Sequence, residues 1–329
     1  MNICYTRHGH NMFDISSMIQ KALRRSDADS AFYAANEMII EYRSYLWKRL
    51  LTVSLEDCHD MVTSDIYKLR EKDMAYKNSD KYVSKAVSIL LQARKNRDAD
   101  YFACNYQNSW NKIELFKYCE KLDEYPEFLT RNGHSAYDVR DFLISAIENL
   151  DCKSAGYASR ELITRYPNFF WRTLQEESIN LRFQDLTEEI KYCKKAAEFN
   201  LRSLSAAKAL VLLMKAIKLG NTSELKYELA LYDVELSRYN NVRLEIPSYV
   251  YDCHTKIGKM RGKTKENFIV DEQASLKPFT KGWFDDSTWS KYLFLAKNGW
   301  DNPNTIEAPM PSNKALKELE NGIIQQTLF

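Results

Sequence analysis

The first residues that could do chemistry are Thr6-Arg7-His8-Gly9-His10, near the start of the chain. In such a segment the arginine could bind a phosphate group while the adjacent imidazole attacks the phosphorus, which is covalent catalysis by a histidine nucleophile. This is the chemistry of a phosphatase that works through a phosphohistidine. The alternative is a structural turn, in which Gly9 supplies backbone freedom ahead of a helix capped by Asp14.

An internal duplication favours the turn. Residues 6–55 align without a gap to residues 130–179 at a constant offset of 124, and 17 of the 50 aligned positions are identical, more than chance produces. The second copy has Asn132 where the first has His8, so it lacks the nucleophile. Both copies keep Thr-Arg-x-Gly-His, and Asp138 is the expected helix cap of the second. We therefore expect a turn that both copies need, and no phosphatase.

The composition indicates an all-α protein. Among 329 residues there are only nine glycines and seven prolines, and apolar residues recur at helical spacing without the alternation of strands. Helices are expected over residues 14–23, 27–40, 45–53, 80–94, 98–122 and 204–219, and a polar link is expected before the fourth.

The duplication also divides the chain. Residues 1–128 form a first helical unit, and residues 129–253 form a second that repeats it. Residues 254–329 hold a basic loop, an irregular segment rich in proline that contains Trp283, Trp289 and Trp300, and a C-terminal tail.

Composition also limits the function classes. A net charge of +2 is too small to identify a nucleic-acid-binding protein by itself, so that interpretation depends on local clusters. The seven cysteines form no CxxC pair, which disfavours structural zinc and favours reduced thiols. No leader or long apolar run is present, so we expect a soluble, cytoplasmic protein without a membrane span, and no cofactor or metal.

Two clusters of basic residues are candidates for binding nucleic acid. In the first unit they are Lys21, Arg24, Arg25, Lys48 and Arg49, and in the third segment they are Lys256, Lys259, Arg261, Lys263 and Lys265. Such clusters bind the phosphate backbone of DNA, although each could also be a solvated surface. The stretch from Gly258 to Thr264 ends like a P-loop, but it has three residues between its glycines instead of four and no strand before it, so we expect no ATP hydrolysis.

A third group of residues could form a metal or acid–base site. Glu56, Asp57 and His59 lie within one helical turn, and His254 could join them from a distant part of the chain. The chemistry would be metal-dependent hydrolysis. Since such a run is also common on a polar surface, hydrolysis is the lesser alternative.

The chain ends in Gln325-Gln326-Thr327-Leu328-Phe329, which fits Gln-x-x-Leu-Phe. This pattern is similar to the peptide by which many bacterial replication and repair proteins bind the β sliding clamp. The amide of Gln325 would fix the register by hydrogen bonds, while Leu328 and Phe329 would fill an apolar pocket. The alternative is a terminal Leu-Phe pair that packs against the protein's own core.

Residues 19–33 and 47–57 resemble the C-terminal helical region of the replication-associated recombination ATPases (RarA, also called MgsA). In that family the region follows an AAA+ module, is similar to a clamp-loader collar and supports oligomerisation at replication forks. The resemblance therefore implies a collar-like fold, a replication context and a possible homo-oligomer. This sequence contains no AAA+ module, so ATP-dependent activity does not carry over.

Together these observations predict a non-enzymatic accessory protein of DNA replication or recombination, from a bacterial cell or a phage-infected host. It would bind DNA through its basic clusters and the sliding clamp through its C-terminal peptide. The alternative from another class is a scaffold or inhibitor that binds a nucleic-acid enzyme without touching DNA.

Overall fold

The structure is a computed structural model that describes residues 4–76, 80–104, 128–130, 132–228, 230 and 234–282 of the chain. These residues form an all-α fold, and no β-strand occurs among them. The clamp peptide with Gln325, Leu328 and Phe329 lies outside the described residues, as do the three tryptophans of the third segment. No helix in the described part of the chain has the length and apolar character needed to cross a bilayer.

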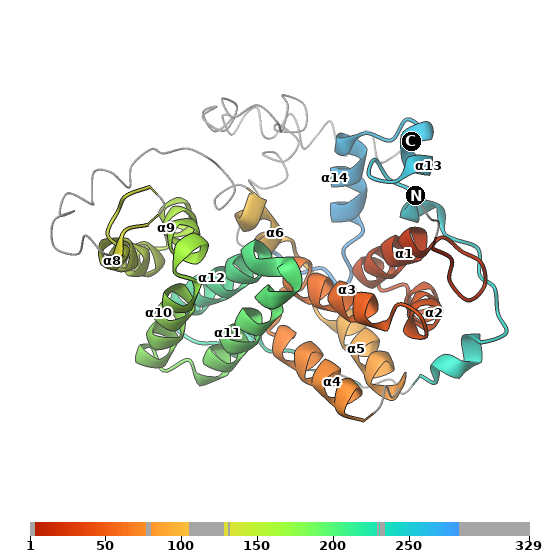
Figure 1. Ribbon diagram of the computed structural model, residues 1–329, viewed down its shortest axis with the longest axis horizontal. Helices are drawn as coiled ribbons and strands as arrows, with labels where there is room; N and C mark the ends of the chain where they lie inside the picture. The colour runs from red at the N-terminus through yellow and green to blue at the C-terminus, as the bar shows by residue number, and fades with distance from the viewer. Residues whose placement is uncertain are drawn as a thin grey trace.

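Figure 1 shows two groups of helices side by side, coloured red to orange and yellow to green. The first group contains α1 (Met12–Arg25), α2 (Ala28–Ile39), α3 (Arg43–Glu56), α4 (Thr63–Ala75), α5 (Asp80–Gln92) and the short α6 (Asp98–Phe102). The second contains α8 (Ala136–Glu148), α9 (Cys152–Arg165), α10 (Pro167–Asn180), α11 (Gln184–Ala196) and α12 (Arg202–Leu219). The helices α8, α9 and α10 each begin 124 residues after α1, α2 and α3, so the duplication in sequence is also one in structure.

The Thr-Arg-x-Gly-His segments form the same turn in both units. The amide of Thr6 donates to the carbonyl of His10 (2.8 Å), and in the second unit Thr130 donates to His134 (2.7 Å). Gly9 and Gly133 have φ of 77° and 84°, in the left-handed region where a side chain is strained. The predicted turn is confirmed, and its glycine is required by the backbone conformation.

The predicted helix caps were wrong by three residues. Asn11 precedes α1, and its side chain accepts a hydrogen bond from the amide of Phe13 (2.9 Å), while Ser135 occupies the same position before α8. Asp14 and Asp138 lie in the first turn, where their charge still favours the positive end of the helix dipole.

Two segments predicted to be irregular contain helices. The polar link before residue 80 contains α4, and the basic loop contains α13 (Lys256–Met260) and α14 (Lys265–Ala274), separated by a turn at Gly262 (φ 72°). The helix predicted over residues 98–122 is described only as far as residue 104, where α6 forms its start.

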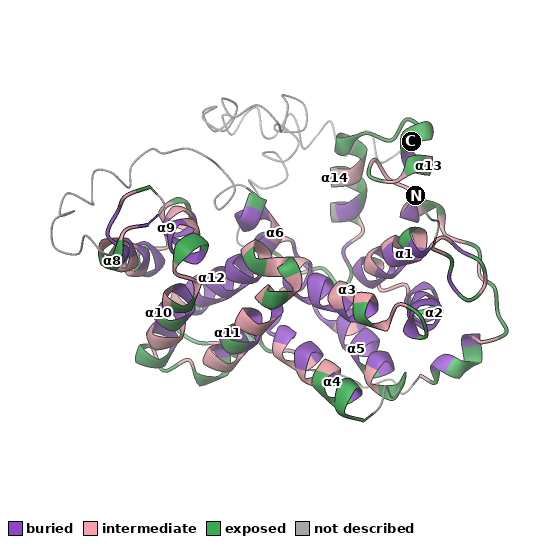
Figure 2. Cartoon of the chain, in the orientation of Figure 1, coloured by how far each residue is buried: buried purple, intermediate pink, exposed green. Residues whose placement is uncertain are grey.

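The buried side chains form a core that runs through both units (Figure 2). Trp47 in α3 and Trp171 in α10 are equivalent positions of the repeat, and both are 2% exposed. The apolar stripes of α5 and α12 are also buried, as their helical spacing predicted. Burial of equivalent faces explains why these positions match best between the two copies.

The two units are joined by buried charged side chains of the second unit that bond to the backbone of the first. The carboxylate of Glu189 in α11 accepts from the amides of Thr63 (2.8 Å) and Ser64 (2.9 Å), which begin α4. The ammonium of Lys208 in α12 donates to the carbonyls of Cys58 and Asp60 (3.1 Å to the latter), which follow α3. Glu189 thus brings a negative charge to the start of α4, which the helix dipole favours.

After α12 the chain returns along the first unit, seen in teal at the right edge of Figure 1. The hydroxyls of Tyr239 and Tyr249 bond to Asp29 (3.0 Å) and Asp27 (2.7 Å) at the start of α2. The sequence predicts that residues up to 253 belong to the second unit, but the residues from Val234 to Asp252 bond to the first. This return path delivers α13 and α14 to the outer face of α1.

Candidate functional site

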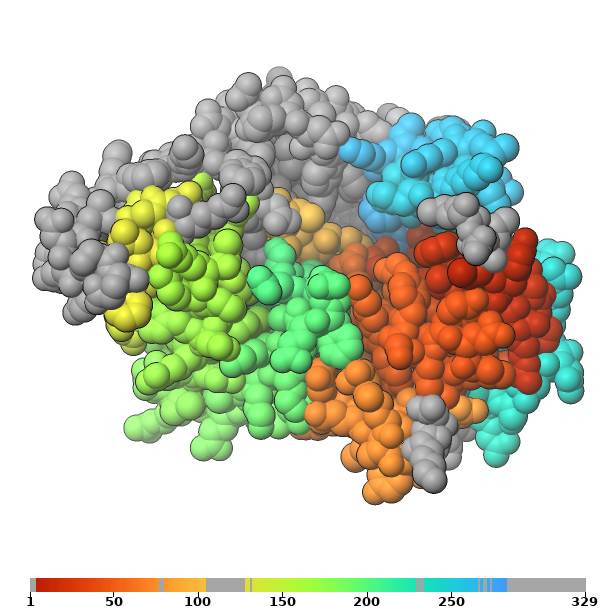
Figure 3. Space-filling model, viewed as in Figure 1, coloured from red at the N-terminus to blue at the C-terminus, as the bar shows by residue number. Residues whose placement is uncertain are grey.

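The segment with the strongest potential for binding is the basic one that contains α13 and α14. Its five cations are all exposed: Lys256, Lys259, Arg261, Lys263 and Lys265. The ammonium of Lys263 lies 3.3 Å from the carboxylate of Asp271, and the guanidinium of Arg261 lies 5.2 Å from the ring centre of Tyr251. In Figure 3 this segment, coloured blue, stands on the surface beside α1. An exposed group of cations can bind phosphates.

The other predicted basic cluster does not form such a surface. Lys21 and Arg24 of α1 are only 3% and 2% exposed, so they cannot reach a phosphate backbone. Arg25 is half-buried and pairs with Glu272 (3.1 Å), and Arg49 donates to Ser16 (2.7 Å). Lys48 is half-buried on α3. The prediction of a DNA-binding face on the first unit is therefore corrected for Lys21 and Arg24.

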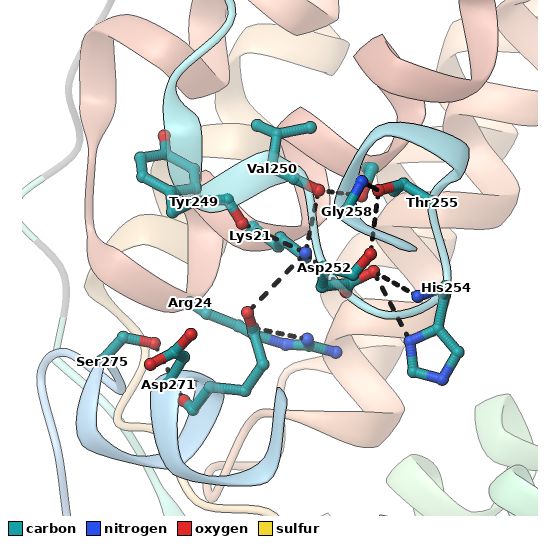
Figure 4. A network of polar contacts seen from close by, with 12 residues as sticks. Lys21, Arg24, Tyr249, Val250, Asp252, His254, Thr255, Gly258, Asp271 and Ser275 are labelled. Atoms are coloured by element: carbon teal, nitrogen blue, oxygen red, sulfur yellow. Dashed lines mark hydrogen bonds and ion pairs between the residues drawn. The ribbon is translucent and has the colours of Figure 1, made fainter. Parts of the chain in front are cut away.

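Lys21 instead anchors the segment before α13 (Figure 4). Its ammonium lies 2.5 Å from the carboxylate of Asp252 and donates to the carbonyls of Tyr249 (3.1 Å) and Val250 (2.9 Å). Although burial alone would raise the pKa of Asp252, hydrogen bonds from His254 and Lys21 hold it well below the usual range. Asp252 therefore remains ionised at neutral pH and keeps its ion pair with Lys21.

Arg24 anchors α14. Its guanidinium donates to Glu272 in α14 (2.8 Å), to Asp57 (2.7 Å) and to Glu56 (2.6 Å), so one buried cation serves three carboxylates. Burial would raise the pKa of Glu272, but the charges of Arg24 and Arg25 lower it. The two basic clusters predicted from the sequence are thus neighbours, and the first holds the second in place.

The second unit lacks this anchor. The positions equivalent to Lys21, Arg24 and Arg25 carry Ser145, Glu148 and Asn149. A carboxylate at position 148 would repel the acids that hold α13 and α14 on the first unit. The divergence of charge between the copies therefore determines which unit carries the basic segment.

A close backbone contact also fixes α13. Gly258 is buried, and a Cβ atom built at this position would lie 1.8 Å from the carbonyl oxygen of Asp252. Gly258→Ala should therefore push α13 away from the segment before it and cost about 1–3 kcal/mol. Hydrogen exchange should show faster exchange in residues 249–263, whereas Lys259→Ala, on the exposed face of the same helix, should leave exchange unchanged. Equal protection in both variants would contradict the close contact.

The segment from Gly258 to Thr264 does not have the form of a P-loop. Gly258 lies inside α13, and no strand precedes it in the described part of the chain. The hydroxyl of Thr264 accepts from the amide of Asn267 (3.3 Å) at the start of α14, which is an N-cap contact. The start of α14 could have been predicted from the sequence, because Thr264 is followed three residues later by Asn267, a spacing typical of a helix N-cap.

The imidazole of His8 is not free to act as a nucleophile. Its Nδ1 lies 2.5 Å from the carboxylate of Glu37, and its Nε2 lies 3.1 Å from the carbonyl of Asn240. In the second unit the amide of Asn132 contacts Glu161, the equivalent of Glu37. His8 and Asn132 thus make the same contact with a glutamate, which explains why asparagine can stand in the second copy where the first has histidine.

The predicted acid–base residues do not form one site. The Nδ1 atom of His59 accepts a hydrogen bond from Asn96 (2.9 Å) and lies 3.3 Å from the ammonium of Lys215. His254 is exposed elsewhere, and its ring packs edge-on against that of Phe268, with 4.7 Å between the ring centres. Glu56 and Asp57 are bonded to Arg24. Within the described ranges no group of histidine, cysteine, aspartate and glutamate has an arrangement that could hold a metal ion.

The charge state of His59 gives a testable pH dependence. Burial, followed by the positive charges of Lys215, Lys208 and Arg94, lowers the pKa of His59 to about 2. The unfolded chain binds a proton on this group below about pH 6.5 and the folded chain does not, so stability should fall with decreasing pH by about 1.4 kcal/mol per unit.

The control for this prediction is His59→Gln, measured by urea unfolding between pH 7.5 and 5.5. The variant should lose less stability over this range than the wild type, because the proton uptake of residue 59 is absent. Parallel pH profiles would contradict a neutral, buried His59.

These features define an all-α protein built from a duplicated helical unit, with an anchored basic segment on the first copy. Comparison with protein-family models, with curated proteins and with solved structures found no match for this chain.

Proposed function

We propose that the protein binds DNA as a non-enzymatic accessory factor of replication or recombination in the cytoplasm of a bacterial or phage-infected cell. The observation that supports this role is the exposure of all five cations on α13, the turn after it and the start of α14, next to the buried cations of α1 that hold the segment in place. Because the backbone that carries these cations is anchored to α1, little backbone freedom is lost on binding phosphates, which suits the segment to contact with a nucleic-acid backbone.

The test is DNA binding by a variant with Lys259, Arg261 and Lys263 changed to alanine. At low salt its affinity for a labelled 20-base-pair duplex should fall at least tenfold, because three phosphate contacts are removed. A variant with Lys72, Lys81 and Lys85 changed to alanine is the matched control, since these exposed lysines of α4 and α5 carry the same total charge. Equal losses in the two variants would contradict a specific role for α13 and α14.

The proposal retains the sliding clamp as the protein partner, on the basis of Gln325, Leu328 and Phe329. Deleting residues 325–329 should abolish clamp binding in a calorimetric titration while DNA affinity stays unchanged. Clamp binding of equal affinity with and without these residues would contradict a clamp-binding role for the C-terminal peptide. The resemblance to the RarA collar region supports the same replication context and a homo-oligomer.

A scaffold role is the second candidate, because aromatic side chains are exposed where the second unit begins. Phe128 and Tyr137 are 41% and 37% exposed, and with Phe169 they line a shallow apolar pocket. Exposed apolar patches of this kind often contact other proteins. No DNA binding even at low salt would favour the scaffold.

A further inference from the structure

A pocket lies between α14 and the segment that precedes α13. Three half-buried aromatic rings, Tyr249, Tyr251 and Phe268, line it together with Arg25 and Lys263. Figure 4 shows Tyr249 and Asp252 on the segment before α13, and Asp271 and Ser275 on α14 and directly after it. The pocket is thus formed by the elements that carry the exposed cations.

The walls of this pocket have the chemistry that binds a nucleobase. Tyr249 has the guanidinium of Arg25 at 4.6 Å from its ring centre, and Tyr251 has that of Arg261 at 5.2 Å. Aromatic rings and guanidinium planes are the groups on which unpaired bases stack in proteins that bind single strands. The carboxylate of Asp271 also borders the pocket, where it would repel a phosphate but accept a hydrogen bond from a base edge.

The pocket is adjacent to the cations that would hold the strand. Lys263 lines the pocket itself, and Arg261 contacts one of its rings. A strand whose phosphates lie on α13 and the turn at Gly262 would therefore have its bases next to the opening.

We propose that this pocket binds one unpaired base of a single-stranded nucleic acid. The inference rests on the proposed function, because the same strand must contact α13 through its phosphates. A base inside an intact duplex is stacked between its neighbours and presents only its edges, so it cannot enter. The protein therefore binds single strands, or duplexes with an unpaired base, more tightly than intact duplexes.

The experiment compares a labelled single-stranded 20-mer of mixed sequence with its duplex by fluorescence anisotropy. Phe268→Ala should weaken single-strand binding about tenfold, as expected for a lost base stack, and should change duplex affinity less than twofold. The slope of log affinity against log salt should stay the same in this variant, because no phosphate contact is removed. Tyr76→Ala is the aromatic control: this side chain is 67% exposed after α4, away from the pocket, so its removal should keep the wild-type affinity.

A second measurement needs no variant in the pocket. A strand with a single 2-aminopurine should change its fluorescence on binding to the wild-type protein when the analogue enters the pocket, and this change should be absent with the same strand in a duplex. Unchanged fluorescence, or single-strand binding by Phe268→Ala equal to that of the wild type, would overturn the base pocket while DNA binding through α13 and α14 stands. Failure of the wild type to bind either form would overturn both.

Discussion

Arg24→Ala is expected to lower the free energy of unfolding by about 3–5 kcal/mol, the usual cost of removing one partner from a buried ion pair. Arg24 is 2% exposed, and its guanidinium pairs with the carboxylates of Glu56, Asp57 and Glu272, so its removal leaves these three acids without this cation. Urea unfolding followed by circular dichroism measures the change.

The control is Arg172→Ala in α10. Arg172 also forms an ion pair with a glutamate, Glu176, at 2.6 Å, but its side chain is 75% exposed. Exposed pairs contribute less than about 1 kcal/mol, so this variant should stay close to the wild type. Similar losses in the two variants would show that Arg24 does not anchor α14.

Lys208→Ala is expected to cost about 3–5 kcal/mol, because it removes a long buried side chain together with its hydrogen bonds to the carbonyls after α3. Lys208 is 2% exposed and joins α12 of the second unit to residues 58–60 of the first. Differential scanning calorimetry or urea unfolding measures the loss.

The internal repeat provides the matched control. Lys85 in α5 corresponds to Lys208 in the alignment of the two copies, but it is exposed. Lys85→Ala should therefore change stability by less than about 0.5 kcal/mol. If Lys208→Ala were equally mild, the buried lysine would have no role in joining the units.

Local features of the fold could be predicted from the sequence. The turn at Gly9 and Gly133 followed from the pattern kept in both copies, and the helices of the first unit followed from apolar spacing. The helix α4 was missed because the segment from Thr63 to Ala75 contains charges on most of its surface. Its stability comes from packing against neighbours such as α5 and α11, which a local pattern does not show.

The site was predictable only in part. The exposed cations of residues 256–265 were identified by their clustering, which is a local property. The burial of Arg24 depends on Glu272, 248 residues away in sequence, and that of Lys21 depends on a segment after the second unit. The aromatic residues at positions 249, 251 and 268 were missed for the same reason, since they become neighbours only when α14 packs on α1.

DNA binding through α13 and α14 is tested by the salt dependence of the affinity of the intact protein and of the variant with Lys259, Arg261 and Lys263 changed to alanine. The logarithm of the association constant should fall linearly with the logarithm of salt concentration, and the slope should be shallower in the variant by about 2–3, close to one per cation removed. An identical slope in the two proteins, or no binding by the wild type at low salt, would contradict this role of α13 and α14.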